Sequence, residues 1–390
     1  MGETAEHGDG SLLARRYHDP RYRAILADIA LGLAVPAVRA FTPAGQAVLG
    51  VVDPLPAAVG ALLLGILIMQ ISALVRLPLS VWLGLLHERA FGFSRQSRRD
   101  FALDRLKAVA IGSVLTGAAL AGLVLCARAF PSAWPLVAAG GAALVVLLLS
   151  FVAPVVLEPI FNKFRPLEVS TLRDAVLKLG DDASVPVREV LVADASRRTT
   201  KLNAYVSGLG ATRRVVLFDT LLDQASTPEI LTVVAHELGH RRYRHVAIGT
   251  AVAMGGVAAV VLALWSLLSS EAVLDAIDAT GPGDAHVVAF ALLVASLLGL
   301  VGAPLHAALS RRWEYACDRF ALEQTGDLGA FESAFGRLSE ANLPDPAPPR
   351  LAYLWLFAHP TVPERLEAAR ASCLRKMSGR GSGHSSREDP

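Results

Sequence analysis

The sequence predicts a mostly α-helical membrane protein with about six spans and an α+β domain on the cytoplasmic side of the membrane. Three observations indicate this fold class. Of the 390 residues, 53% are hydrophobic and only 18% are charged, whereas a soluble domain usually carries about 25% charged residues. Five segments each hold roughly 20 mostly apolar residues, which is the length that a membrane-crossing helix needs. The polar residues gather in two regions, at about 158–245 and 310–390.

The first span, 24–41, is the weakest, because it contains Asp28, Pro36 and Arg39. It could instead be a signal peptide, with the upstream arginines as its basic region and Val38-Arg39-Ala40 as its cleavage site. Charged residues inside the apolar stretch disfavour that alternative, so we expect a retained helix. The clearer spans are 57–80, 107–130, 134–157, 246–269 and 286–309.

Loop charges predict the orientation of these spans. With the N-terminus inside, the inner segments 1–23 and 82–106 carry clusters of arginine, whereas the outer loops 42–56, 131–133 and 270–285 contain no Lys or Arg. Because cytoplasmic loops carry the excess of basic residues, both chain ends are expected in the cytoplasm. The Ala-, Leu- and Arg-rich composition is typical of bacteria, so the bacterial plasma membrane is the expected location.

Charge and cysteine content exclude two other classes of protein. The net charge is +2, from 37 basic and 35 acidic residues, so bulk electrostatic attraction to nucleic acid is excluded. The three cysteines, Cys126, Cys317 and Cys373, indicate no disulfide framework.

The first polar region predicts a small α+β unit. Ser170–Asp181 has the apolar spacing of an amphipathic helix, and Val187–Val192 that of a strand. Asn203–Leu209 and Arg214–Phe218 are β-rich, and Gly208 and Gly210 indicate a turn that joins them as a hairpin.

Two further helices are expected to join the polar regions to spans. Thr227 suits a helix N-cap and Pro228 the first helical position. No breaker follows before Gly249, so this helix is expected to run directly into the fifth span. The sixth span is expected to continue to about Gln324, until Gly326 stops it.

The strongest motif lies in the helix that starts at 228. It reads His236-Glu237-Leu238-Gly239-His240. The spacing of four places both imidazoles on one helix face, where they can share one zinc ion. Glu237 lies beside them and can act on a water that the zinc activates. The alternative is two solvated histidines on a polar helix face.

A catalytic zinc usually has three protein ligands and an open position. Glu314 and Asp318, four residues apart at the cytoplasmic end of the sixth span, offer carboxylates on one helix face. We assign Glu314 as the third ligand and Asp318 as the group that orients a ligand imidazole. A surface ion pair of Glu314 with a neighbouring arginine is the alternative. Cys317 could be a softer ligand but lies off the face of Glu314.

These residues and several other blocks resemble the type 1 CAAX prenyl protease family, integral-membrane zinc endopeptidases that process a-factor and prelamin A in eukaryotes. The resemblance extends from about Leu77 to Leu366. Several blocks in the right order are more specific than the zinc motif alone. They are Leu77–Ser80, Glu88–Phe93, Glu158–Leu167, Asn203–Tyr205, Val215–Leu222, Ser310–Asp318 and His359–Leu366.

The resemblance implies roles for the site residues. It implies one zinc ion on His236, His240 and Glu314, with Glu237 as the catalytic base. It also implies a functional role for Asp318, either as a proton donor or, as we prefer, in orientation, because an Asp is a poor acid at neutral pH.

The resemblance implies further roles outside this group. Asn203 and His359 are expected to hold substrate or the developing oxyanion, although a turn-forming Asn and a surface His are the alternatives. Arg365 could bind a substrate carboxylate or support Glu314.

The fold that the resemblance implies is a ring of membrane helices around a water-filled chamber, with the zinc site at its cytoplasmic side. It also implies a monomer. Three features depart from the family. This sequence has about six spans where eukaryotic members have seven. It lacks the acidic insertion that some members carry before the zinc helix. Position 317 is Cys rather than the usual Ala.

We therefore expect an N-terminal membrane region at 1–157 with four spans and a basic inner loop. A zinc metallopeptidase domain follows at 158–376 and includes the last two spans, and 377–390 form a disordered tail. The expected reaction is hydrolysis of internal peptide bonds in a peptide or protein, lipidated or membrane-bound. A membrane quality-control protease with no prenyl requirement is the alternative. A scaffold with a structural metal is disfavoured, because such sites normally have four protein ligands.

Overall fold

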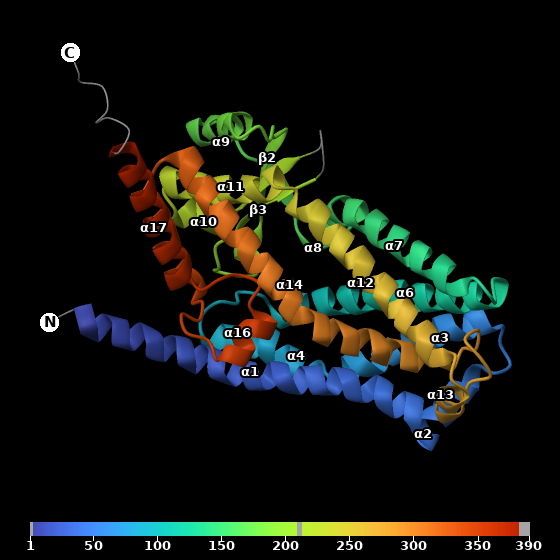
Figure 1. The fold of residues 1–390 in the computed structure, drawn as a ribbon. Helices are drawn as coiled ribbons and strands as arrows, with labels where there is room; N and C mark the ends of the chain where they lie inside the picture. Colours follow the sequence, from blue (N-terminus) through green and yellow to red (C-terminus); the bar gives the residue numbers. More distant parts are fainter. Residues whose placement is uncertain (1–2, 209–212, 382–390) are drawn as a thin grey trace, which may run out of the picture.

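A computed structural model describes the backbone of residues 3–208 and 213–381 and the side chains of 12–208 and 213–375. Long helices lie side by side along most of the molecule, and an α/β region sits at one end of them (Figure 1). The start of α1 (Glu3–Phe41) and the last helix, α17 (Val362–Gly381), both lie at that end. Both ends of the described chain are therefore on the same side as the α/β region.

Six helices of the described chain are long and apolar enough to cross a membrane, which confirms the predicted number. Helix α1 runs through the weak span 24–41 and packs against α14 and α3, as a retained helix would. The last span stops at Gly326, whose φ is +66°, as predicted. The six are α1, α3 (Ala57–Val75), α6 (Arg98–Ala129), α7 (Trp134–Val152), α12 (His245–Leu268) and α14 (Val287–Thr325).

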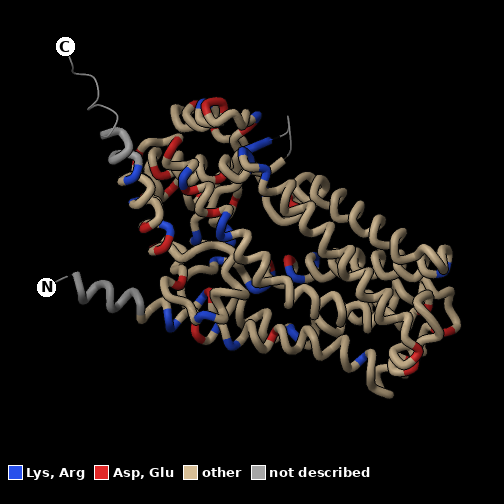
Figure 2. Tube along the Cα trace, viewed as in Figure 1, with Lys and Arg blue, Asp and Glu red and all other residues tan. Residues whose placement is uncertain are grey.

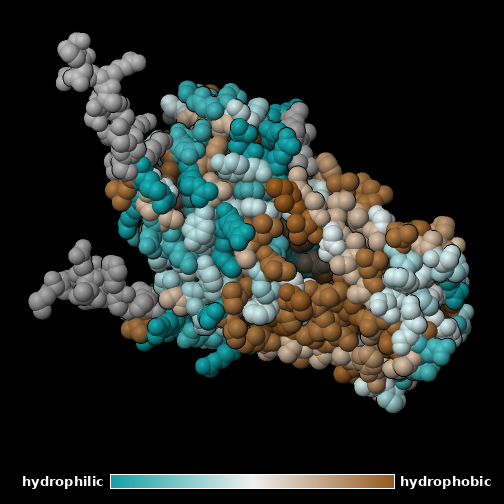
Figure 3. Space-filling model, in the orientation of Figure 1, coloured by the Kyte–Doolittle hydropathy of each residue, from teal (hydrophilic) through white to brown (hydrophobic). Residues whose placement is uncertain are grey.

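The distribution of side chains over the surface agrees with membrane embedding. Lys, Arg, Asp and Glu gather in the α/β region and are sparse along the middle of the long helices (Figure 2). The same middle section is covered by apolar side chains, and a recess opens between them on the face in view (Figure 3). A broad apolar surface along the helices, as on the face in view, is what a bilayer covers.

Charged residues tie the N-terminal helices to the rest of the chain. Within the first span, Asp28 accepts a hydrogen bond of 2.7 Å from Nε of Arg76, which explains how this span tolerates an acidic residue. Nearer the α/β region, Glu88 accepts hydrogen bonds from Tyr17 at 2.5 Å and from Lys201 at 2.8 Å. This second cluster joins α1 to the segment that precedes β3.

Short helical elements turn the chain between the spans. Helix α4 leads through the π-helical turn η2 into α5, and α7 leads through the π-helical turn η3 into α8. Their bounds are α2 (Pro43–Leu49), η1 (Gly50–Val52), α4 (Leu77–Val81), η2 (Trp82–Leu86), α5 (His87–Ala90), η3 (Ala153–Leu157), α8 (Glu158–Phe161) and α13 (Glu271–Ala276).

A sheet with strand order β1-β2-β4-β3 forms the centre of the α/β region. The predicted pairing of β3 with β4 is confirmed and is antiparallel; of the glycines expected in the turn, Gly210 lies outside the described residues. Strand β2 runs parallel to β4, and β1, which the sequence analysis missed, pairs with β2. Strand β3 is therefore an edge strand. The strands are β1 (Phe164–Pro166), β2 (Glu189–Ala193), β3 (Ala204–Ser207) and β4 (Arg214–Phe218).

Helices cover this sheet and enclose a hydrophobic core. Val176, Val215, Leu217 and Leu238 are among the buried side chains that join the sheet to the helices. The amphipathic helix predicted at Ser170–Asp181 is confirmed, with Ser170 as its N-cap. The helical elements are α9 (Thr171–Asp182), η4 (Ala195–Arg197), α10 (Asp219–Gln224), α11 (Thr227–Arg242), α15 (Leu328–Asn342) and α16 (Arg350–Leu356).

Helix α17 ends at Gly381, so its last turn overlaps the start of the predicted disordered tail at 377–390. The remainder of that tail lies outside the described residues.

Helix α11 begins one residue earlier than expected, with Ser226 as its N-cap instead of Thr227. Glu229 accepts a hydrogen bond of 2.6 Å from the backbone N–H of Ser226 and others from Ser333 and Arg337 of α15. Burial opposes ionisation of Glu229, but these hydrogen bonds outweigh it and lower its pKa to about 2. A buried carboxylate thus fixes the start of α11 against α15.

The prediction that α11 runs unbroken into the fifth span is wrong. Helix α11 ends at Arg242, and α12 begins at His245. Between them Arg244 has a φ of +58°, a left-handed conformation in which the helix cannot continue. The expectation failed because it considered only Gly and Pro as breakers, and an arginine rarely adopts this conformation.

Candidate metal centre

Two helices supply the centre. Helix α11 presents His236 and His240 one turn apart on one face, and α14 packs against that helix. The two helices are close at Gly239: a Cβ atom built there would lie only 3.2 Å from the backbone Cα of Cys317. Glycine therefore lets α14 approach until Glu314 reaches both imidazoles.

The three predicted ligand side chains meet at one point. The Nε2 atoms of His236 and His240 are 3.3 Å apart. Oε2 of Glu314 is 3.3 Å from Nε2 of His236, and Oε1 is 3.2 Å from Nε2 of His240. Ligand atoms at about 2.0–2.1 Å from a tetrahedral zinc ion are themselves about 3.3 Å apart. The spacing of the donor atoms therefore fits one such ion.

The polar atoms of Glu314 also fit a metal. This side chain is fully enclosed, with 2% of its surface exposed, and Oε2 has no hydrogen-bond partner among the described residues. Buried carboxylate oxygens without a hydrogen bond are costly. A cation bound between Oε2 and the imidazoles would satisfy this atom.

Asp318 and Arg365 hold the ring of His236 from behind. Oδ1 of Asp318 lies 2.9 Å from Nδ1 of His236. Arg365, on α17, donates to Asp318 through Nε at 2.8 Å and through Nη2 at 2.6 Å. A hydrogen bond at Nδ1 leaves Nε2 of His236 free to bind a metal. The contacts thus suit the orienting role predicted for Asp318.

The surroundings favour positive charge at the centre. Burial opposes protonation of His236, but hydrogen bonds to Asp318 and Glu314 outweigh it and raise its pKa to about 9. Burial raises the pKa of Glu237, while the nearby imidazoles oppose that rise. Burial opposes the charged form of Arg365, but the charge of Asp318 outweighs it and raises the pKa of Arg365.

His359 and Arg365 both contact Glu314. Nε2 of His359 lies 3.6 Å from Oε1 of Glu314, and 65% of its side chain is exposed. Nη1 of Arg365 lies 3.4 Å from Oε2 of Glu314, and the arginine is itself buried. Arg365 was expected either to bind a substrate carboxylate or to support Glu314. These contacts favour the second role, and contact of Arg365 with substrate stays a prediction.

Asn203 lies at the start of β3 and is exposed. Its Oδ1 accepts a hydrogen bond of 2.9 Å from the backbone N–H of Ala204, which is the local contact of a turn-forming Asn. Strand β3 itself packs against α11. The predicted contact of Asn203 with substrate stays a prediction.

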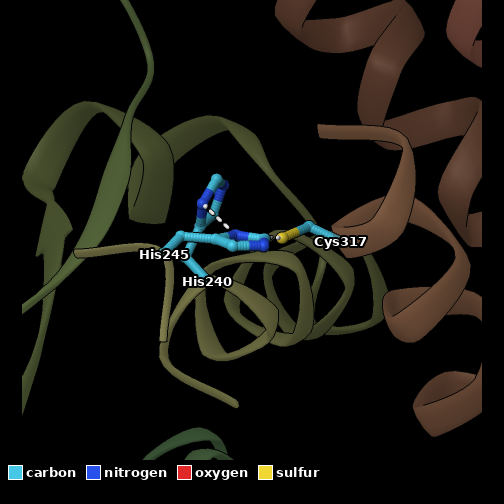
Figure 4. Close-up of side chains that lie close together, drawn as sticks. All are labelled: His240, His245 and Cys317. Atoms are coloured by element: carbon cyan, nitrogen blue, oxygen red, sulfur yellow. Dashed lines mark hydrogen bonds between the residues drawn. The ribbon is translucent and has the colours of Figure 1, made fainter. Parts of the chain in front are cut away.

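The sequence analysis missed His245. Its Nδ1 lies 3.2 Å from Nδ1 of His240 and 3.6 Å from Sγ of Cys317 (Figure 4). Its ring stacks on Trp313 at a centroid distance of 4.8 Å. On an unbroken helix, a spacing of five residues would turn His245 away from His240. The only available signal was a third histidine shortly after the motif.

Comparisons with known proteins agree with this arrangement. Residues 166–372 match the model of peptidase family M48. Residues 29–163 match the N-terminal region of CAAX prenyl proteases, which is described as having five membrane helices. Within that range the described chain has four helices long enough to cross a membrane and the shorter apolar segment Pro43–Val52.

Individual proteins are also similar. The uncharacterized metalloprotease YhfN of Bacillus subtilis is 30% identical over 77% of this chain and 70% of its own length. A probable CAAX prenyl protease 1 of Schizosaccharomyces pombe is 28% identical over 78% of this chain and 64% of its own length. The crystal structure of S. mikatae Ste24p has a TM-score of 0.77 at 24% identity, covering 93% of this chain and 88% of that one. It supports the fold.

Replacing Glu314 tests the centre directly. E314Q removes the charged oxygen ligand, so we expect the affinity for the metal to fall by at least about tenfold and less metal to remain after dialysis. Elemental analysis of the purified protein measures this. E323Q is the matched control, because Glu323 is exposed on the same helix, and it should retain the metal. Full retention by E314Q would exclude Glu314 as a ligand.

Proposed function

The chain belongs to peptidase family M48, and from this premise we propose that its metal is zinc, held by His236, His240 and Glu314, and that it cleaves internal peptide bonds. That it is a membrane metalloprotease similar to CAAX prenyl proteases follows from the matches to both halves of the chain. The observation that carries the proposal is the meeting of three side chains beside Glu237: the facing nitrogen and oxygen atoms of His236, His240 and Glu314 lie 3.2–3.3 Å apart. Two imidazoles and one carboxylate are a ligand set typical of catalytic zinc.

Different residues have different roles in the proposed hydrolysis. When bound, zinc supplies Lewis acidity that polarises the peptide carbonyl and makes water more acidic. Glu237 accepts a proton from the attacking water as the new C–O bond forms. It then delivers that proton to the leaving nitrogen as the C–N bond breaks. Asp318, fixed by Arg365, keeps His236 in the ring orientation that binds metal.

His359 is proposed to stabilise the oxyanion. Its Nε2 lies 3.6 Å from the ligand oxygen of Glu314, and its side chain is largely exposed. An exposed donor at the edge of the centre can reach the carbonyl oxygen of a bound peptide. A hydrogen bond to the negative charge that develops there would lower the barrier.

The edge of β3 that faces away from β4 is proposed to hold the peptide. The backbone N–H of Phe218 donates to the carbonyl of Asn203, so in an antiparallel ladder Ala204 and Val206 turn their polar groups away from β4. Arg241 of α11 donates to the carbonyl of Val206, which fixes this edge beside the metal-binding helix. An extended peptide could add to the edge by backbone hydrogen bonds.

We propose that the centre faces the cytoplasm. The α/β region lies at the end of the helices that carries both ends of the described chain, and the arginine-rich segments 1–23 and 82–106 are expected on that side. The segments without Lys or Arg, such as 131–133, are then outside.

Two cysteine substitutions test this orientation in a C126A/C373A background, whose one remaining native thiol, Cys317, is buried. S132C, in an exposed outer loop, should react with a membrane-impermeant maleimide in intact cells, whereas K178C, exposed on α9, should react only after lysis. The reverse pattern would invert the proposed orientation.

Exchange of the catalytic base tests the mechanism. E237Q keeps the shape of the side chain but cannot accept a proton, so cleavage of a peptide should fall by at least about a hundredfold while the metal is retained. Cleavage and metal content are measured on the same preparation, with E323Q as control. Undiminished cleavage by E237Q would refute its role.

The substrate is the remaining question. We propose a lipidated protein substrate, on the strength of the match to CAAX prenyl proteases; a quality-control protease that needs no lipid is the alternative. A farnesylated CAAX peptide and its unlipidated twin separate the two proposals. Faster cleavage of the farnesylated peptide is expected, and equal cleavage of both would favour the alternative. A chelator should stop both reactions.

A further inference from the structure

A second group of possible metal ligands lies behind the first. It consists of His240 on α11, His245 at the start of α12 and Cys317 on α14, whose ligand atoms all lie within 4.8 Å of one another. The side chains converge between the helices (Figure 4). His245 is 6% exposed and Cys317 is fully buried. This group uses Nδ1 of His240, whereas the first group uses Nε2.

The backbone is shaped so that this group can form. Arg244, with its φ of +58°, ends α11 and turns the chain so that His245 returns toward His240. A left-handed conformation is unfavourable for a residue other than glycine, so contacts elsewhere must maintain it. The ring of His245, stacked on Trp313 with only 10° between the planes, is such a contact.

Two hydrogen-bond donors face one acceptor in this group when His245 carries its proton on Nε2. When Nε2 of His240 binds a metal, Nδ1 carries the ring proton and can donate it to Nδ1 of His245. That atom of His245 has a single lone pair, yet Sγ of Cys317 also faces it at 3.6 Å. The thiol and the imidazole of His240 therefore compete for one acceptor.

The distances suit a cation at the centre of the group. Zinc-type ions bind imidazole nitrogen at about 2.0–2.1 Å and thiolate sulfur at about 2.3 Å, so tetrahedral ligands are about 3.3 Å apart for two nitrogens and about 3.6 Å for nitrogen and sulfur. The observed separations are 3.2 Å between the two Nδ1 atoms and 3.6 Å between Nδ1 of His245 and Sγ.

We propose that Nδ1 of His240, Nδ1 of His245 and Sγ of Cys317 form a second binding site for a thiophilic divalent cation. Binding releases two protons, one from the thiol of Cys317 and one from Nδ1 of His240. The resulting thiolate and imidazolate carry two negative charges, which the divalent ion neutralises. His245 binds as a neutral imidazole that keeps its proton on Nε2.

Occupation of this site inhibits the enzyme. His240 would then hold an ion on each ring nitrogen, and the second ion would draw its ring toward Cys317 and away from Glu314. The inhibition, unlike the binding, rests on the proposed function. Cation binding is therefore measured separately from cleavage.

Cadmium is the probe, because its bond to a thiolate gives an ultraviolet absorption band. The metal-loaded full-length protein is titrated with Cd²⁺ in detergent. In C126A/C373A, whose one remaining thiol is Cys317, we expect the band to saturate at one Cd²⁺ per chain, with the first metal retained by elemental analysis. C317A should lose the band. H245Q should weaken binding by at least about tenfold.

Several outcomes would overturn the proposal. Absence of the band in C126A/C373A, or undiminished affinity in H245Q, would show that these atoms do not bind a cation together. Release of the first metal as Cd²⁺ binds would show replacement at the first centre. Cadmium should also inhibit cleavage by the wild type at least tenfold more strongly than cleavage by C317A. If no peptide is cleaved at all, the proposed function fails while the binding result stands.

Discussion

The close crossing of α11 and α14 is the constraint on which the site depends. Gly239 permits it, since any Cβ there would press against the backbone of Cys317. With a larger residue the helices would separate, and Glu314 would withdraw from the two imidazoles. The same crossing brings Asp318 to His236 and Cys317 to His245. One small residue thus sets the geometry of both groups of possible metal ligands.

Features that depend on local patterns could be predicted from the sequence. The six spans follow from the length of apolar segments, and the pairing of β3 with β4 follows from β-rich runs around a turn. The stop of α14 at Gly326 follows from a residue suited to positive φ. In the centre, His236 and His240 share a face because of helical spacing alone. Glu314 could be chosen because it lies at the cytoplasmic end of the sixth span, as the two histidines lie at the start of the fifth.

Features that depend on tertiary contacts could not be predicted. Arg244 shows no preference for the left-handed region, and its conformation is set by what His245 contacts afterwards. Strand β1 is short and exists because β2 offers a partner. From the sequence, Arg365 was equally suited to binding substrate and to supporting Glu314. Only the packing of α17 shows that it donates hydrogen bonds to Asp318. Each of these choices is made by residues distant in sequence.

The balance of charge gives an independent reason for a cation at the centre. Glu237, Glu314 and Asp318 gather there, with Arg365 buried among them and the charge of Arg241 also acting on Glu237. If all of these groups are ionised, the three carboxylates outnumber the two guanidinium groups, and burying unpaired charge is expensive. The raised pKa of His236 is the response of the protein to that deficit. A divalent ion held between the imidazoles and Glu314 would offset this excess of negative charge without protonating a ligand.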